Sequence, residues 1–113
     1  MRPIDFDYLS PTNETWQAII APYLQQAKTF EIHCWQDESQ AIKQALIYGE
    51  LKESGWPYGE VIIGEVTPEF TNYLLTLPKP QDTEIYNKMT PFFSIFLDDI
   101  FSSSHYGTEL YGE

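Results

Sequence analysis

The residues best suited to chemistry in this chain are one cysteine, two histidines and seventeen acidic side chains. His33 and Cys34 are adjacent in a segment that alternates apolar and polar residues, so on a strand their side chains point to opposite faces. A cysteine–histidine catalytic pair needs side chains that converge within hydrogen-bond reach, which leaves His105 as the only base for Cys34. We therefore expect Cys34 to pack as a small core residue.

Metal and acid–base sites have no supporting pattern either. The histidines and the cysteine match no zinc-ligand spacing, and no calcium-loop pattern surrounds Asp98 and Asp99. General acid–base catalysis needs two carboxyl groups in different environments, and no local sequence marks such a pair. Phosphate-binding glycine patterns, the nucleophile elbow and the kinase signatures are also absent from the sequence. The sequence predicts that the chain is not an enzyme and uses no metal and no cofactor.

Negative charge is the dominant property of the chain. Seventeen Asp and Glu against six Lys and Arg give a formal net charge of −11 in 113 residues. The hydrophobic fraction of 42% and the aromatic fraction of 16% indicate a folded domain rather than an acidic disordered segment. Nucleic acids and anionic membranes need a basic face, so neither is an expected partner. A basic protein is the expected partner, although negative charge also serves solubility alone.

Aromatic and acidic residues occur together in three places. Tyr and Trp are enriched at protein interfaces, and carboxylates beside them complement Lys and Arg of a partner. The predicted partner-binding residues are Trp56, Tyr58 and Glu60 in a turn and strand, Asp98 and Asp99 on the last expected helix, and Tyr106, Glu109 and Tyr111 near the carboxyl terminus. For each aromatic residue, the alternative is that it caps the core with only its polar tip exposed.

Secondary-structure elements must position these residues. The clearest helical pattern covers Ser10 to Ala27. Its apolar residues recur at helical spacing and are Trp16, Ile19, Ile20, Tyr23, Leu24 and Ala27. Ser10 and Pro11 suit a cap and a first turn, as expected at a helix start. Pro22 lies inside the pattern and is expected to kink or divide the helix.

Two strands and a second helix are expected next. Thr29 to Trp35 alternates, and a strand there would place Phe30, Ile32 and Cys34 on one face and Glu31, His33 and Trp35 on the other. A helix is expected after a cap at Asp37, with Gln40 completing a capping box. Glu60 to Val66 predicts a further strand.

Two segments with a similar residue pattern predict two more helices with similar buried faces. Thr67–Leu74 and Thr90–Leu97 both begin with Thr-Pro and carry apolar residues at matching positions. Thr would cap each helix and Pro would occupy its first turn. A short strand is expected near Ile85 and Tyr86, in the polar loop between the two copies.

Together these elements predict one α+β domain over residues 1–113, with about four helices and a small sheet of two to four strands. Residues 105–113 are expected to form an extended tail or an edge strand. No apolar run approaches the roughly 20 residues that span a bilayer, and residues 1–7 do not resemble a secretory signal. The single cysteine rules out an intrachain disulfide. We expect a cytoplasmic protein, as either a monomer or a dimer.

In size, charge and aromatic-acidic patches, the chain resembles the small immunity proteins of bacterial toxin systems, including contact-dependent growth inhibition. The resemblance implies a cytoplasmic protein that binds and neutralises a basic toxin domain, for example a nuclease. Carboxylates would occupy the toxin's substrate site in place of phosphates, while Tyr and Trp serve as anchors. Such proteins differ greatly in fold, so the resemblance transfers no residue. A mimic of DNA is a narrower form of the same hypothesis.

Two other classes of function are alternatives. One is an acidic adaptor or secretion chaperone, dimeric, that holds an extended client segment against an apolar groove. The other is a small enzyme in which carboxylates or His105 act in a cleft. An exposed apolar patch would favour the first, and two convergent titratable groups with displaced pKa values would favour the second.

Overall fold

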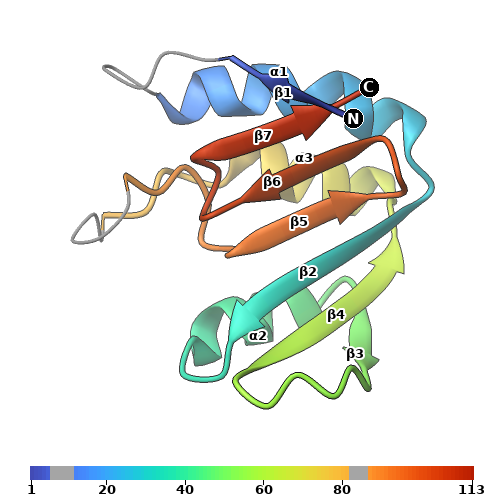
Figure 1. Cartoon of the computed structure of the whole chain (residues 1–113), viewed down its shortest axis with the longest axis vertical. Coiled ribbons are helices and arrows are strands. Elements are labelled where there is room, and N and C mark those ends of the chain that lie inside the picture. Colours follow the sequence, from blue (N-terminus) through green and yellow to red (C-terminus); the bar gives the residue numbers. More distant parts are fainter. Residues whose placement is uncertain (6–11, 82–86) are drawn as a thin grey trace.

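A seven-stranded antiparallel sheet with the strand order β1-β7-β6-β5-β2-β4-β3 forms the centre of the fold (Figure 1). The computed structural model describes residues 1–5, 12–81 and 87–113. The strands are β1 (Arg2–Ile4), β2 (Thr29–Trp35), β3 (Glu50–Lys52), β4 (Gly59–Glu65), β5 (Ser94–Leu97), β6 (Phe101–Ser104) and β7 (Glu109–Gly112). The helices are α1 (Asn13–Gln26), α2 (Ser39–Leu46) and α3 (Pro68–Thr76).

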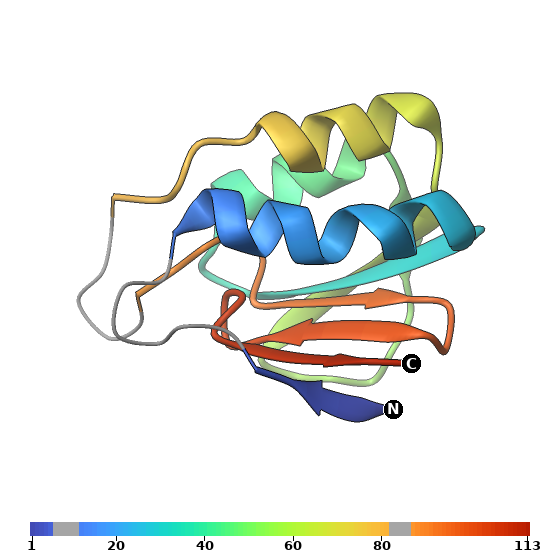
Figure 2. The same ribbon diagram turned by 90° about the horizontal axis from the view of Figure 1, so that it is seen from above.

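All three helices lie on the same side of the sheet (Figure 2). The predicted alternation in β2 is confirmed: Phe30, Ile32 and Cys34 are buried, and the intervening residues are half-buried. The buried set faces the helices, because Phe30 stacks on Phe70 of α3 with ring centroids 4.0 Å apart. We call the opposite side of the sheet, which α1, α2 and α3 leave uncovered, the open face. The main hydrophobic core therefore lies in the layer between sheet and helices.

Helix α1 confirms the helix expected between residues 10 and 27. Thr12 is its N-cap, with a side-chain oxygen that accepts a hydrogen bond from the Thr15 N–H. Ser10 and Pro11, the expected start, lie outside the described residues. The helix is continuous through Pro22 and is not divided there. Pro22 and Ala18 are both exposed, so the missing Pro22 N–H falls on the solvent side of the helix.

The expected helices after Asp37 and Thr67 are also present, as α2 and α3. The N-cap of α2 is Glu38 rather than Asp37, and Glu38 forms no side-chain cap hydrogen bond within that helix. In α3, the Thr67 hydroxyl accepts a hydrogen bond from the Phe70 N–H, and proline occupies the first turn as predicted.

The prediction of about four helices and two to four strands is wrong: the described residues form three helices and seven strands. The fourth helix, expected from Thr90, is instead the strand β5. Its apolar run pairs with β2, where Ile95 lies opposite Ile32 and Leu97 opposite Phe30. A short, continuous apolar run suits a buried strand as well as a buried helix, so periodicity could not separate them.

Residues 105–113, which were expected to form an extended tail or an edge strand, contribute the strand β7. This strand lies between β1 and β6, so it is an interior strand rather than an edge. The expected strand near Ile85 and Tyr86 falls outside the described residues. Within the described part of the chain, no helix has the length and apolar character that crossing a membrane requires.

Candidate binding face

The open face carries an aromatic cluster, made of His33, Trp35, Trp56, Phe93 and Phe96. His33 contacts Phe96 and Trp56 with ring centroids 5.0 and 5.9 Å apart. Trp35 contacts Trp56 and Phe93, both at 5.0 Å. The cluster extends the buried part of the molecule beyond the helix-covered core.

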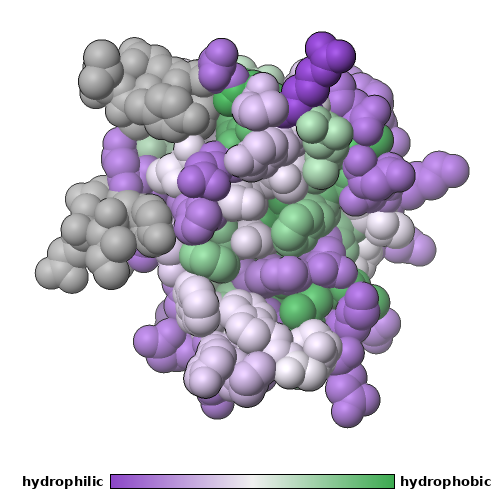
Figure 3. Space-filling model, in the orientation of Figure 1, coloured by the Kyte–Doolittle hydropathy of each residue, from purple (hydrophilic) through white to green (hydrophobic). Residues whose placement is uncertain are grey.

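Two small residues beside His33 show how well the aromatic cluster covers the sheet. Val61 of β4 and Ser94 of β5 both lie opposite His33 in the strand register. They are only 5% and 7% exposed, although none of α1, α2 and α3 covers this face. Figure 3 shows pale, near-neutral side chains gathered at the lower end of the open face, with hydrophilic and hydrophobic ones above them.

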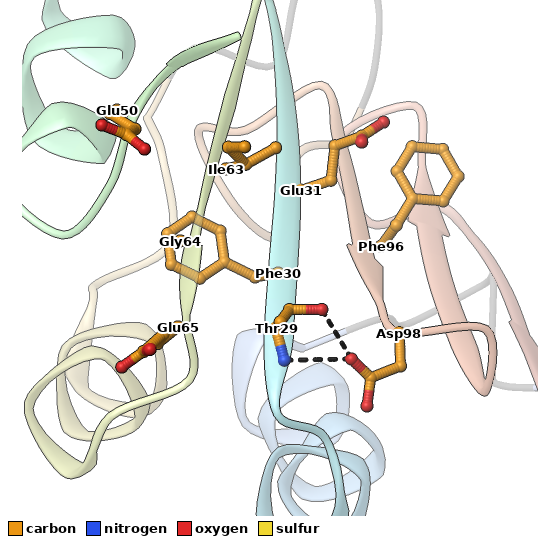
Figure 4. A pocket seen from close by; sticks show the side chains of 9 residues that line it. All are labelled: Thr29, Phe30, Glu31, Glu50, Ile63, Gly64, Glu65, Phe96 and Asp98. Carbon is orange, nitrogen blue, oxygen red and sulfur yellow. Dashed lines mark hydrogen bonds between the residues drawn. The ribbon is translucent and has the colours of Figure 1, made fainter.

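Beside the aromatic cluster, the open face is hollowed over β2, β4 and β5 (Figure 4). This acidic hollow has a volume of about 570 Å³ and is lined by Thr29, Phe30, Glu31, Glu50, Ile63, Gly64, Glu65, Phe96 and Asp98. Four of these nine residues carry carboxylates, and the apolar contribution on the open face comes from Ile63 and Phe96. The hollow thus joins apolar surface to concentrated negative charge.

Asp98 is the carboxylate of the acidic hollow that is held in place by the fold. It accepts hydrogen bonds from the Thr29 hydroxyl at 2.7 Å and from the N–H groups of Thr29 and Lys28, both at 2.9 Å. These bonds, the Thr29 hydroxyl first, lower the pKa of Asp98 below its ordinary value. The carboxylate therefore stays charged and ties the β5–β6 turn to the start of β2.

Glu31 separates the acidic hollow from a second one. Its carboxylate contacts His33 Nε2 at 2.7 Å and Lys52 Nζ at 3.5 Å. The second hollow, of about 490 Å³, is lined by Glu31, His33, Lys52, Glu53, Ser54, Trp56 and Val61. Lys52 thus already neutralises Glu31 in part.

The other two carboxylates of the acidic hollow, those of Glu50 and Glu65, are free to receive a cation. Neither forms an ion pair or a side-chain hydrogen bond with any residue in the described ranges 1–5, 12–81 and 87–113. Both residues are exposed, and in the register Glu65 lies opposite Thr29 and Glu50 opposite Ile63. The negative charge of the hollow is therefore available to a partner chiefly at these two positions.

The structure brings four of the eight predicted partner-binding residues to the open face. Trp56 belongs to the aromatic cluster and Asp98 lines the acidic hollow. Tyr111 lies opposite Ser102, which in turn lies opposite Phe96, so it shares the open side of the sheet. Glu109 shares that side two residues earlier, and its Oε2 lies 3.1 Å from His105 Nδ1.

The other four predicted residues lie elsewhere. Glu60 lies opposite the buried Cys34, on the helix side of β4, and Tyr58 is 68% exposed in the turn before that strand. Asp99 is in the β5–β6 turn rather than on a helix, which corrects the placement expected for it and for Asp98. The fourth, Tyr106, is 6% exposed and donates a hydrogen bond of 2.7 Å to the Glu38 carboxylate, so it is a packed residue.

Sequence reasoning did not identify Glu31, Glu50, Glu65 and Phe96 as candidates. A signal existed for the first of them, because the alternation of residues 29–35 already placed Glu31 on the same face as His33 and Trp35. The other three depend on strand pairing between distant segments.

The structure also places Cys34 and the groups that could ligate a metal ion. Cys34 is fully buried, and burial first, with the nearby Glu38 charge second, raises the pKa of its thiol to about 12. The thiol is therefore protonated at neutral pH and is not a nucleophile. No group of three or more His, Cys, Asp or Glu side chains among the described residues could hold a metal ion.

Comparisons with protein-family models, with curated proteins and with solved structures find no match for this chain. The candidate site is therefore defined by geometry and charge. It is an uncovered sheet face with an acidic hollow and an aromatic cluster side by side.

Proposed function

We propose that this chain is an inhibitor of the immunity-protein kind, which binds a basic toxin domain through the open face of its sheet. The observation that carries the proposal is the acidic hollow, with the unpaired carboxylates of Glu50 and Glu65 beside the apolar side chains of Ile63 and Phe96. A protein interface needs complementary shape and charge, and this hollow offers both to a basic side chain.

A lysine or arginine side chain suits this combination of apolar and charged surface. Both have an apolar stem that packs along hydrophobic surface and a charged head that seeks carboxylates. In the acidic hollow, the stem would lie against Ile63 and Phe96 while the head meets Glu50 and Glu65. Arginine would fit best, because its planar guanidinium also stacks on an aromatic face.

The aromatic cluster would supply the anchor of the same interface. Interface hot spots are enriched in Trp, Tyr and Arg and lie in well-packed, desolvated surroundings. Trp35 and Trp56 are half-buried and pack against one another at 5.0 Å, so little side-chain freedom would be lost on binding. If the toxin is a nuclease, the carboxylates of the open face would take the place of substrate phosphates.

The experiment that tests the inhibitor function combines capture with a growth assay. Immobilised chain is incubated with lysates of bacteria related to its source, and bound protein is eluted in a salt gradient and identified. We expect one basic protein at a one-to-one ratio, eluting at high salt. Its domain should stop growth when expressed alone and permit growth when this chain is co-expressed.

Two outcomes would contradict the proposal. A captured basic protein whose toxicity is unaffected by co-expression would refute the inhibitor function. Several clients bound through extended segments would instead support the adaptor or secretion-chaperone alternative.

A further inference from the structure

The two edge strands of the sheet are built differently. The edge strand β1 contains Pro3, which has no N–H to offer to another strand. The opposite edge strand, β3, contains no proline and pairs only with β4 among the described residues (Figure 1). An edge strand with free backbone groups is a template for another strand.

Exposed apolar side chains gather next to β3. Leu51 is 54% exposed, Ile47 65% and Leu46 37%, and these are three of the five large exposed hydrophobic residues in the described part of the chain. Leu51 lies opposite the fully buried Ile62, so it points to the helix side, where α2 ends at Leu46. Proteins that protect an edge strand from pairing do not normally leave exposed apolar side chains next to that strand.

The charges of β3 are complementary to those of an identical strand. The strand reads Glu50-Leu51-Lys52, and all three residues are exposed. In an antiparallel pair centred on Leu51, Glu50 of each copy lies opposite Lys52 of the other, which stabilises the pair. Charged residues at an edge usually prevent pairing, but this arrangement attracts a second copy.

We propose that two copies of this chain pair antiparallel through β3, with Leu51 facing Leu51 across a twofold axis. The sheet would then continue from one copy into the other, and Ile47 and Leu51 of both copies would cover one another on the helix side. The apolar patch would thus be buried by the second copy rather than left open for a client segment, as a secretion chaperone would need. Each strand contributes only three residues, and each copy carries a charge of −11, so the dimer forms only at high protein concentration and at moderate salt, where the long-range repulsion is screened. In the monomer Glu50 stays unpaired among the described residues, and the monomer is the form that would bind the basic partner.

Sedimentation velocity with charge-swapped variants tests this pairing, over chain concentrations from about 10 µM to about 1 mM. We expect the unaltered chain to shift towards dimer across this range. Glu50→Lys and Lys52→Glu each place like charges opposite one another, and each should weaken self-association at least about tenfold. Mixing these two variants restores opposite charges at both positions and should yield a heterodimer. The double variant E50K/K52E should associate like the unaltered chain.

The mixing experiment also controls for misfolding, because each single variant must be folded to form the heterodimer. The proposal is overturned if the unaltered chain remains monomeric at the highest concentration. It is equally overturned if the single variants self-associate as strongly as the unaltered chain, because the dimer would then use another surface.

Discussion

A chain carrying Phe70→Ala is expected to lose about 3–5 kcal/mol of its free energy of unfolding, the cost of emptying a packed aromatic site in a core. Phe70 is fully buried between α3 and the sheet, and its ring stacks on Phe30 at 4.0 Å. Small domains have a total stability of about 5–15 kcal/mol, so this one change would consume much of it. Chemical denaturation followed by circular dichroism measures the loss.

Phe96→Ala is the matched control for this prediction, because it removes the same side chain from the open face. Phe96 is half-buried and contacts His33 at 5.0 Å, outside the helix-covered core. We expect a loss of only about 1–2 kcal/mol, in proportion to the smaller area buried. Equal losses for the two variants would contradict the assignment of the main core to the helix side.

The second prediction with a large expected effect concerns the affinity for the basic partner. Glu53→Lys combined with Glu65→Lys reverses one carboxylate in each hollow of the open face. Like charges juxtaposed across an interface cost several kcal/mol, so we expect the affinity for the captured basic partner to fall at least about a hundredfold, or about 2.8 kcal/mol. Surface plasmon resonance at two salt concentrations measures this loss.

The helix side of the molecule offers a control with the same change in net charge. Glu14 and Glu69 lie in the first turns of α1 and α3, on the side of the sheet away from the hollows. Reversing both to lysine costs about 0.3–1 kcal/mol of stability at each helix start and should lower the affinity less than about tenfold through the long-range field alone. If the two double variants bind equally weakly, net charge rather than the open face governs binding.

Local sequence was sufficient for the elements whose pattern is unambiguous. Thr67 and the proline after it marked the start of α3, and alternation from Thr29 to Trp35 separated the two faces of β2. The local sequence did not predict the structure of residues 94–97, because an apolar run is buried whether it forms a helix or a strand. Pairing with β2, more than sixty residues earlier in the chain, decides between them.

The candidate site was harder to predict than the elements, because strand pairing brings its residues together from distant parts of the chain. The acidic hollow brings together residues near positions 30, 50, 64 and 97 of the chain, which no local pattern connects. The strand β3 has only three residues, too few for its pattern to separate a strand from a continuation of the helix before it. Tyr106 was predicted to bind a partner, but its hydroxyl donates a hydrogen bond to Glu38, sixty-eight residues earlier in the chain. No local pattern indicates that contact. Composition pointed to a basic partner, whereas the surface proposed for it came from the fold.

Zero-length carbodiimide cross-linking of the purified complex, followed by peptide mass spectrometry, tests most directly whether the open face binds a basic partner. The reaction joins a carboxylate only to a lysine amine that it contacts. We predict cross-links to partner lysines from Glu50 and Glu65 of the acidic hollow, and none from Glu14 and Glu69 on the helix side. Cross-links from Glu14 and Glu69 without any from the acidic hollow would contradict the account.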